Sequence, residues 1–318
     1  MIIGQDKAVA QFRAAWDGGT LHHAWLLAGP RGVGKASFAR AAATRILADA
    51  AGPRLDLPGV ETPADHAIAR LVAAGSHPDL RILERLENEK TGNLARNISV
   101  DQVRGLGDLF ELTPALSPWR AVIIDAADDL EGSAANALLK MLEEPPANCL
   151  FLLVAHAPGR LLPTIRSRCR RLEFQRLDDD AMTAVLATST EIPAEKRDRI
   201  IAMASGSAGR ALAFAGLDLA PLEEKAISIL RDGDPTNARR SELAGELGKK
   251  GAGDRYAAFL ELVPTIVARE AREATGGRRA RALEAYARAR ELAAIAPRVS
   301  LDPAATIFQL GGILASVP

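Results

Sequence analysis

The chain has 318 residues, of which 48% are apolar and 25% are charged, and its formal net charge is zero. This length and apolar content suffice for two or three domains with ordinary cores, and they exclude an intrinsically disordered chain. Because the charges balance, any contact with nucleic acid must come from local basic patches. The only cysteines, Cys149 and Cys169, exclude a disulfide framework and a four-cysteine zinc site.

Cysteine usage and hydropathy also indicate a cellular compartment. With so few cysteines, a reducing environment is expected. The sequence shows no charged-then-apolar leader and no run of about 18 apolar residues, so neither secretion nor membrane insertion is indicated. We therefore expect a cytoplasmic protein.

A phosphate-binding loop is predicted near the amino terminus. The apolar run 24–28 predicts a buried strand, and residues 36–48 predict a helix. Glycine N–H groups turn toward phosphate oxygens in such loops, and Lys35 would reach the outer phosphates. The alternative is a glycine-rich turn before a helix. The residues with the spacing and place of this loop are Gly29, Arg31, Gly32, Val33, Gly34, Lys35, Ala36 and Ser37.

One position of this loop departs from the pattern. The residue after the lysine is normally Ser or Thr, whose hydroxyl ligates the Mg²⁺ of the nucleotide, and here it is Ala36. Ser37 comes one residue too late, because a step of about 100° around the helix turns it away. The metal chemistry of the loop is therefore expected to be impaired.

The segments that follow continue to alternate between helix and strand. Residues 67–74 predict a short helix, residues 80–83 a strand, and the polar residues 87–93 an exposed turn. Ser99 and Gln102 have the spacing of a capping box. This box predicts the start of a helix that carries Val103, Leu106, Leu109 and Phe110.

Asp125 ends a second buried strand, predicted over residues 121–125. In phosphate-loop ATPases an aspartate at this place supports the water shell of Mg²⁺, and the next residue is often a glutamate that activates the attacking water. Here Ala126, Ala127 and Asp128 follow, so no general base stands where one is needed. Asp125 has either a vestigial metal role or the role of a strand-end carboxylate that faces solvent or caps a turn.

Later segments complete the predicted sheet. Residues 136–146 predict an amphipathic helix that two prolines end, residues 150–154 another buried strand, and residues 171–174 a final strand. Five apolar strands that alternate with helices favour a parallel sheet covered on both faces.

From residue 177 onward the pattern predicts helices only. Residues 178–188, 194–204 and 210–215 read as a small helical domain, and further helices with charged faces follow. A stripe in this part suits packing within its own domain or association with a like domain: Ala282, Tyr286, Ala289 and Ala293. A last helix begins at Asp302-Pro303 and carries Ile307, Leu310 and Leu314.

Three motifs together carry a resemblance to a known family: the phosphate loop, the run 136–146, and Ser167-Arg168-Cys169. With them the chain resembles the AAA+ clamp-loader subunits of bacterial DNA polymerase III, closely over about residues 1–215 and beyond only by pattern. The resemblance implies an α/β AAA+ P-loop domain with a five-stranded parallel sheet at residues 1–175. It also implies a helical lid domain at 176–218 and an all-α carboxy-terminal collar domain for oligomerisation at 219–318.

The resemblance implies roles for single residues. Residues 29–35 match the nucleotide loop and Asp125 the strand-end acid. Arg168 matches an arginine finger that acts in trans on the ATP of a neighbouring subunit, and Arg210 matches the nucleotide-sensing arginine of the lid. The implied cofactor is ATP or ADP with Mg²⁺, held weakly or vestigially. No zinc is expected, because residues 49–76 lack the cysteines of the zinc module found in many relatives.

The implied partners are gamma/tau and delta subunits in a five-membered ring and, through that complex, the sliding clamp and primer-template DNA. No membrane partner is implied. Ala36 and Ala126 separate the chain from the ATP-hydrolysing subunit and predict a non-motor subunit. Two alternatives remain: an ATP-hydrolysing motor, and a phosphotransferase acting on a small molecule, which would need a substrate pocket and a base near the loop. The residues Arg278, Arg279 and Arg281 start a solvated helix or contact a DNA backbone.

Overall fold

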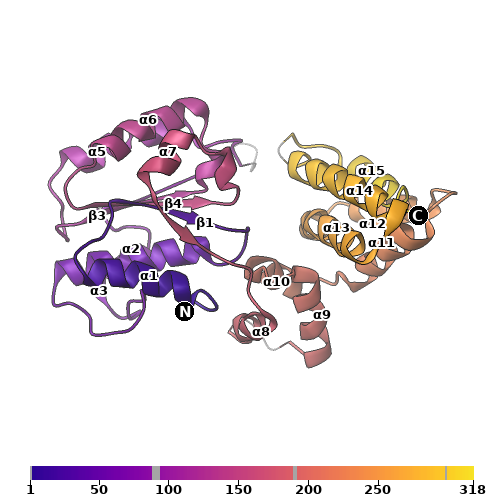
Figure 1. Ribbon diagram of the computed structural model, residues 1–318, viewed down its shortest axis with the longest axis horizontal. Coiled ribbons are helices and arrows are strands. Elements are labelled where there is room, and N and C mark those ends of the chain that lie inside the picture. Colours follow the sequence, from indigo (N-terminus) through magenta and orange to yellow (C-terminus); the bar gives the residue numbers. More distant parts are fainter. Residues whose placement is uncertain (1, 88–93, 189–191, 298) are drawn as a thin grey trace. The chain divides into compact units, whose positions relative to one another are not determined.

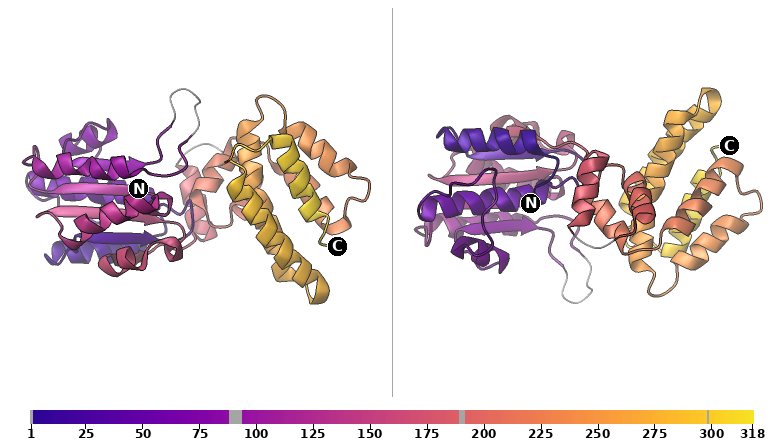
Figure 2. Two further views of the ribbon diagram at one scale, coloured as in Figure 1. Left: turned by 90° about the horizontal axis from the view of Figure 1, so that it is seen from above. Right: turned by 90° about the horizontal axis from the view of Figure 1, so that it is seen from below.

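Two compact units make up the chain, Met1–Ala181 and Met182–Pro318. The computed structural model describes residues 2–87, 94–188, 192–297 and 299–318. Figure 1 shows a sheet between layers of helices in the first unit and packed helices in the second, and Figure 2 shows both units from two further sides. Most of the exposed turn predicted over residues 87–93 lies outside the described residues.

The first unit is built on a five-stranded parallel sheet, as predicted. In the order β2-β3-β4-β1-β5, every neighbouring pair of strands is parallel. The central strands β1 and β4 are buried at every position, which explains their uninterrupted apolar runs. Because all strands run the same way, their carboxyl ends meet at one edge. The strands are β1 (Ala24–Ala28), β2 (Leu80–Glu84), β3 (Arg120–Asp125), β4 (Cys149–Ala155) and β5 (Arg170–Glu173).

Helices cover both faces of this sheet (Figure 1). On one face Phe12 packs edge-on against Trp25, with ring centroids 5.1 Å apart, and against Phe38 at 5.4 Å. On the other face alternate strand residues such as Phe151 form a core with Leu138. The first face carries α1 (Asp6–Asp17), α2 (Lys35–Ala51) and α3 (Ala67–Ala73), and the second α4 (Val100–Arg104), α5 (Leu106–Glu111), α6 (Gly132–Glu143) and α7 (Pro163–Arg168).

Two helices of this unit differ from the prediction. The capping box of Ser99 and Gln102 is present with both reciprocal bonds, but the helix it starts divides at Gly105 into α4 and α5. Gly105 stays in the right-handed helical region, but its ψ of −10° lies about 30° from the ideal helical value, and glycine is a poor helix former. Helix α6 begins at Gly132 instead of residue 136, because Ala134 and Ala135 extend its buried face.

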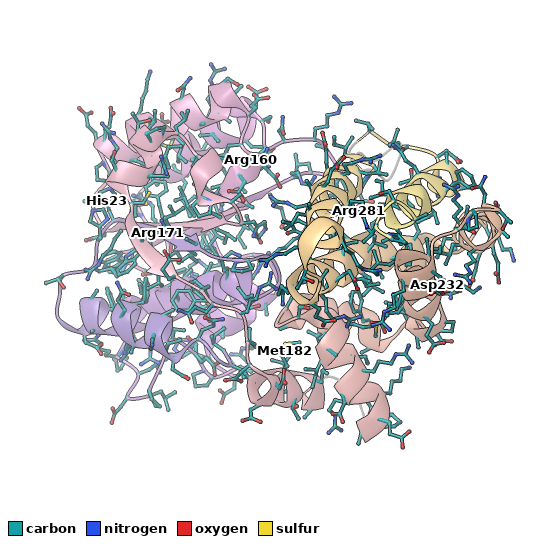
Figure 3. All side chains as sticks on the ribbon, turned by 45° about the vertical axis from the view of Figure 1, so that its right-hand side comes forward. His23, Arg160, Arg171, Met182, Asp232 and Arg281 are labelled. Atoms are coloured by element: carbon teal, nitrogen blue, oxygen red, sulfur yellow. The ribbon has the colours of Figure 1, made fainter. Side chains whose placement is uncertain are left out.

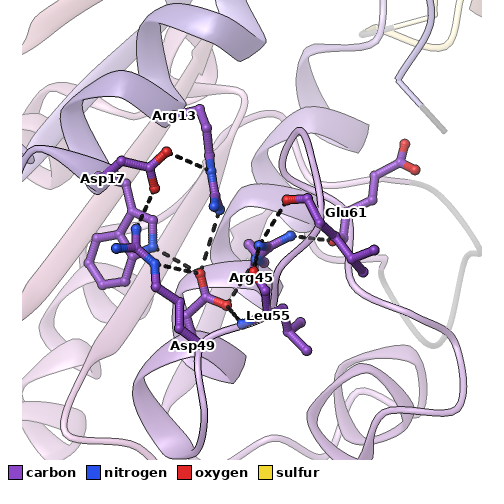
Figure 4. A network of polar contacts seen from close by, with 9 residues as sticks. Arg13, Asp17, Arg45, Asp49, Leu55 and Glu61 are labelled. Carbon is purple, nitrogen blue, oxygen red and sulfur yellow. Dashed lines mark hydrogen bonds and ion pairs between the residues drawn. The ribbon is translucent and has the colours of Figure 1, made fainter.

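A buried ion pair organises the segment between α2 and α3 (Figure 4). The Asp49 carboxylate accepts hydrogen bonds from Arg45 Nε at 2.9 Å, from Trp16 Nε1 at 3.0 Å and from the Leu55 N–H at 3.0 Å. Arg45 in turn donates to the carbonyl oxygens of Leu55, Leu57 and Glu61. We call these residues the Arg45–Asp49 cluster. Its hydrogen bonds tie residues 55–61 to α2, in the part of the sequence that lacks the zinc-module cysteines.

The second unit is helical throughout its described residues. The helices predicted over residues 178–188, 194–204 and 210–215 are present, and α9 and α10 both contact α13. Helix α13 also packs on α14, and α12 on α15. The helices of this region are α8 (Asp179–Ala187), α9 (Ala194–Ala204), α10 (Ala208–Ala215), α11 (Ala220–Asp232), α12 (Ala238–Leu247), α13 (Gly253–Glu273), α14 (Gly276–Ile295) and α15 (Pro303–Leu314). The division into a lid at 176–218 and a collar at 219–318 stays a prediction.

The apolar stripe of α14 differs slightly from the predicted one. Ala282 and Ala289 are buried as expected, but Ala285 is buried in place of Tyr286, which is half-buried like Ala293. The reason is the period of the α-helix, since a step of three residues from Ala282 returns to the packed face. The last helix does bury the three residues predicted, Ile307, Leu310 and Leu314.

The basic start of α14 is engaged within its own unit. Arg278 Nε lies 2.7 Å from Glu270 Oε1, and Arg281 Nε donates to the Val317 carbonyl at 3.0 Å (Arg281 is labelled in Figure 3). These contacts favour the structural reading of this cluster over a DNA contact. Along the described residues of the chain, no helix combines the length and the apolar character that a membrane crossing requires.

Candidate functional site

The phosphate-loop residues lie where β1 passes into α2, which begins at Lys35. Gly32 and Gly34 have φ values of +76° and +97°, a region that favours glycine. No described side chain caps the start of α2, so its first N–H groups remain available to an anion. A Cβ built at Gly34 would meet no atom within 4 Å, so the loop borders open space.

Gly29 is required for a different reason. A Cβ at this position would lie 2.1 Å from the carbonyl oxygen of Phe174. Phe174 follows β5, and its N–H donates to the carbonyl of Ala28 at 2.8 Å. The close approach of the last strand therefore demands a glycine here, whether or not the loop binds a phosphate.

Gln5 fastens the loop, and the sequence analysis did not single it out. Its side chain is buried, and its Nε2 donates to the carbonyls of Val33 at 3.1 Å and of Gln175 at 2.8 Å. Its Oε1 accepts from the Gln175 N–H at 3.2 Å. One side chain thus joins the amino-terminal segment, the loop and the chain after β5. A single glutamine before a helix carries no pattern, so only the structure could identify it.

Lys35 is buried inside the loop, with 3% of its surface exposed. Its Nζ donates to the carbonyl of Gly29 at 2.7 Å and to that of Pro30. Burial lowers the pKa of Lys35 to about 8, while Asp128 and Asp125 oppose this shift. The amine is therefore mainly protonated at neutral pH, and its hydrogen bonds go to carbonyl groups of its own loop.

Asp125 stands at the end of β3, at the same edge of the sheet as Lys35. Its carboxylate is half-buried, and Glu84, its partner in the register of β2 and β3, lies beside it. Burial raises the pKa of Asp125, and the charges of Arg40 and Lys35 oppose the shift. The parallel sheet therefore brings the predicted acid and the predicted lysine into electrostatic reach of each other.

Asp128 anchors the chain that follows β4. It lies in a short 3-10 helix, η1 (Ala127–Asp129), and its Oδ2 accepts from the N–H groups of His156 at 2.5 Å and Ala157 at 3.2 Å. Asp128 Oδ1 and His156 Nδ1 are buried without a hydrogen-bond partner among the described residues. Burial lowers the pKa of His156 to about 4, and Lys35 adds to this shift, so the imidazole is neutral at pH 7.

The residues of the loop fit a phosphate group. The open N–H groups of α2 and the Lys35 amine are donors of the kind that phosphate oxygens accept. They fit a metal ion less well, since Ala36 has no hydroxyl and Ser37 is exposed on the next helical position. Of the predicted groups, Asp125 alone offers an oxygen for the water shell of Mg²⁺. A bound nucleotide would supply a γ-phosphate, and Lys35 and the N–H groups would hold and orient it.

The two cysteines lie in environments that favour the neutral thiol. Cys149 is buried and Cys169 half-buried, and burial raises the pKa of each thiol to about 12. Both thiols are therefore protonated at neutral pH, and a metal ion would have to displace their protons. Within the described ranges, no three His, Cys, Asp or Glu side chains gather where they could hold a metal ion. That the protein carries no zinc stays a prediction.

Arg168 ends α7 and forms an ion pair with the last residue of α6. Its Nη2 lies 2.7 Å from Glu143 Oε1, and its Nη1 donates to the carbonyl of Thr164 at 2.9 Å. The side chains of Arg168 and Glu143 are 34% and 47% exposed. One surface ion pair thus joins the motif at 167–169 to the run 136–146. A purely structural role of Arg168 would require this same contact. The structural role and the predicted role as an arginine finger therefore differ only in what the loss of Arg168 would change.

Arg210 lies in the second unit, at the start of α10. Its N–H donates to Ser207 Oγ at 3.4 Å, which caps the helix, and its Nη1 donates to Thr265 Oγ1 on α13 at 2.7 Å. The second of these bonds connects α10 with α13. The role of Arg210 in sensing a nucleotide stays a prediction.

Three curated relatives match between about 58% and 82% of the chain. A DNA polymerase III subunit delta' from Pseudomonas aeruginosa is 38% identical over 189 residues, which cover 58% of this chain and 53% of that protein. A DNA polymerase III subunit gamma/tau from Mycobacterium tuberculosis is 35% identical over 190 residues, 60% of this chain and 31% of that protein. A DNA polymerase III subunit tau from Bacillus subtilis is 28% identical over 82% of this chain and 45% of that protein. The matches thus span about half the length of these curated relatives, or less.

Among solved structures, a DNA polymerase III gamma subunit-related protein from Thermotoga maritima covers 98% of this chain and 99% of that chain, at 15% identity and a TM-score of 0.44. The family model described as DNA polymerase III, delta subunit, matches residues 4–178, which is more than half of this chain. The matched range contains the phosphate loop, the run 136–146 and Arg168. The chain therefore belongs to the DNA polymerase III, delta subunit family.

Proposed function

We propose that the chain is a non-motor, delta-prime-type AAA+ subunit of the clamp loader of bacterial DNA polymerase III. It would assemble with gamma/tau and delta subunits in a five-membered ring in the cytoplasm. The ring would place the sliding clamp on primer-template DNA at the expense of ATP bound by the other subunits. Two residues carry this proposal: Ala36 stands in the phosphate loop where hydrolysis needs a metal-ligating hydroxyl, and Ala126 follows the strand-end acid Asp125 where hydrolysis needs a general base.

Arg168 is the residue through which this subunit would act on its neighbour. A guanidinium supplied in trans stabilises the charge that develops on the γ-phosphate during transfer, an effect on the order of 10³–10⁵-fold. Arg168 supports this role by its place at the end of α7, with a third of its side chain exposed. Lys35 and the amino terminus of α2 would contribute binding of ATP or ADP, not turnover.

A gamma/tau-type motor is the second candidate. It is favoured by the gamma/tau relative from M. tuberculosis, whose 35% identity is close to the 38% of the delta' relative from P. aeruginosa. This candidate requires hydrolysis by the chain itself, with Lys35 as an essential residue, in spite of Ala36 and Ala126.

Mg-ATP turnover of the purified chain separates the two candidates. We expect the wild-type chain to hydrolyse ATP no faster than Lys35→Ala, because the missing metal ligand and the missing base each remove transition-state stabilisation of roughly 10²-fold or more. After the addition of gamma/tau and delta subunits, clamp and primed DNA, turnover should be high and should persist with Lys35→Ala. Turnover by the isolated chain that disappears with Lys35→Ala would establish the motor and refute the proposal.

A further inference from the structure

The ion pair between Glu143 and Arg168 joins two helix ends whose backbones are already fixed. Glu143 is the last residue of α6, directly after the buried Leu142, and Arg168 is the last residue of α7, which packs through Ile165. Cys169, the next residue, packs against the same core. Neither helix therefore needs the ion pair to hold its place. What the pair determines is the direction of the Arg168 side chain.

Arg168 is held in this direction from two sides. Its Nη2 is paired with Glu143 and its Nη1 with the carbonyl of Thr164. Glu143 lies in the last turn of α6, where the carbonyl ends of the helix add negative potential and strengthen the hold on a cation. A guanidinium has five N–H donors, so after these two contacts Arg168 retains donors for a second anion.

We propose that Glu143 is the positioning residue of Arg168. It orders the guanidinium at the surface in advance, so that contact with the γ-phosphate on a neighbouring subunit does not require a long, mobile side chain to be immobilised. The inference rests on the proposed function of Arg168 as a finger in trans. Ordering one such side chain is worth roughly two- to tenfold in rate. Loss of Glu143 should therefore lower turnover by about that factor, far less than loss of Arg168 itself.

Three substitutions isolate this role. Glu143→Ala removes the partner of Arg168 altogether. Glu143→Gln removes the charge but keeps an oxygen that can accept from Nη2, so it should restore part of the loss. Glu144→Ala is the matched control, since Glu144 is the adjacent exposed glutamate and no ion pair of its side chain is found among the described residues.

Two measurements on these variants test the proposal. The first is kcat and KM for clamp- and DNA-stimulated ATP hydrolysis by the assembled complex, with Arg168→Ala alongside. At the site that Arg168 serves we expect a roughly two- to tenfold fall in kcat for Glu143→Ala, a smaller fall for Glu143→Gln and none for Glu144→Ala, and the fall in the total will be partial if other sites fire independently. The second is the rate at which phenylglyoxal modifies Arg168 in the isolated chain, read by peptide mass spectrometry. It should rise for Glu143→Ala and not for Glu144→Ala.

The possible failures are distinguishable. If Arg168→Ala lowers turnover and Glu143→Ala does not, Arg168 remains a finger and the positioning role of Glu143 is wrong. If Glu143→Ala raises turnover, the carboxylate masks Arg168 instead of preparing it, which also overturns the proposal. If a fully assembled complex with Arg168→Ala turns over at the wild-type rate, the proposed function of Arg168 fails and the inference fails with it.

Discussion

Replacing Asp49 by asparagine removes one charge from the Arg45–Asp49 cluster and keeps the shape of the side chain (Figure 4). The side chains of Asp49 and Arg45 are 0% and 1% exposed, so water cannot compensate either charge. Breaking a buried pair by removing one partner costs about 3–5 kcal/mol, because the other charge stays buried. Arg45 keeps three carbonyl acceptors in the variant. We therefore expect a loss at the lower end, about 3 kcal/mol.

Asp17→Asn is the matched control for this substitution. Asp17 also pairs with arginines, Arg13 and Arg54, but its side chain is 46% exposed. Surface pairs of this kind contribute about 0–1 kcal/mol, since water competes for both partners. The control should therefore lose at most about 1 kcal/mol.

Tryptophan fluorescence reports the unfolding of the first unit alone. All three tryptophans, Trp16, Trp25 and Trp119, lie in the first unit. A guanidinium titration of the whole chain, followed by fluorescence, therefore gives the free energy of unfolding of that unit. A loss for Asp49→Asn as small as that for Asp17→Asn would refute the reasoning that the buried pair holds the segment after α2.

The stability of the first unit at low pH is a second test of the Arg45–Asp49 cluster. Burial by itself would raise the pKa of Asp49, but hydrogen bonds from the Leu55 N–H, Trp16 and Arg45 outweigh burial and hold it below the ordinary value of 3.8. A carboxyl whose pKa is depressed by folding stabilises the folded state fully above its unfolded pKa, and this contribution is lost as pH falls through the folded pKa. The wild-type unit should therefore lose stability more steeply than Asp49→Asn below about pH 3.8. Equal slopes would contradict the assigned role of this carboxylate.

Three further outcomes are expected. Gly29→Ala should sharply lower the unfolding midpoint followed by fluorescence, because its Cβ would lie 2.1 Å from Phe174 O. Gly34→Ala has open space for its Cβ, so it should lose only about 1–3 kcal/mol of unfolding free energy for its positive φ. Similar losses for the two variants would contradict the close approach of β5. Tripolyphosphate binding, followed by calorimetry, should weaken as pH rises through about 8, where Lys35 loses its charge, and Lys35→Ala should abolish this dependence. Elemental analysis should find far less than one zinc per chain, and EDTA should leave the unfolding midpoint unchanged; one zinc per chain would refute this.

The fold of the first unit could be predicted because burial dominates its strands. Strands β1 and β4 are buried on both faces, so their sequences are continuous apolar runs, and this pattern identifies parallel strands with little ambiguity. The edge of the sheet at which Lys35 and Asp125 meet also follows from parallel strands. The helix predicted from Ser99 was correct in its capping box and wrong in its continuity, because a glycine breaks a helix locally without changing the apolar period.

Contacts between polar side chains and groups far away in the sequence could not be predicted. The bonds of Gln5 to Val33 and Gln175, and the ion pair of Arg168 with Glu143, join residues that are far apart in the sequence. Such contacts depend on where the backbones of different elements come to lie, and periodicity carries no information about that. The chemical identity of Ala36 and Ala126, in contrast, is directly visible in the sequence and needs no structure.

Turnover of the assembled clamp-loader complex with Arg168→Ala or Arg168→Lys tests the trans-acting role most directly, provided that thermal stability and assembly are measured on the same variants. We expect nearly normal stability and assembly with reduced clamp- and DNA-stimulated turnover. Lysine should not rescue it, because the planar fork of the guanidinium is lost. At the ATP site that Arg168 serves, the rate of hydrolysis should fall on the order of 10³–10⁵-fold. The total rate of the complex will fall only in part if the other ATP sites act independently.

A purely structural role gives the opposite pattern. If Arg168 only ties α7 to Glu143, its variants will melt earlier and assemble poorly, and turnover per assembled complex will be unchanged. A fully assembled Arg168→Ala complex that hydrolyses ATP at the wild-type rate would contradict the account, and one that assembles normally and turns over slowly is what it predicts.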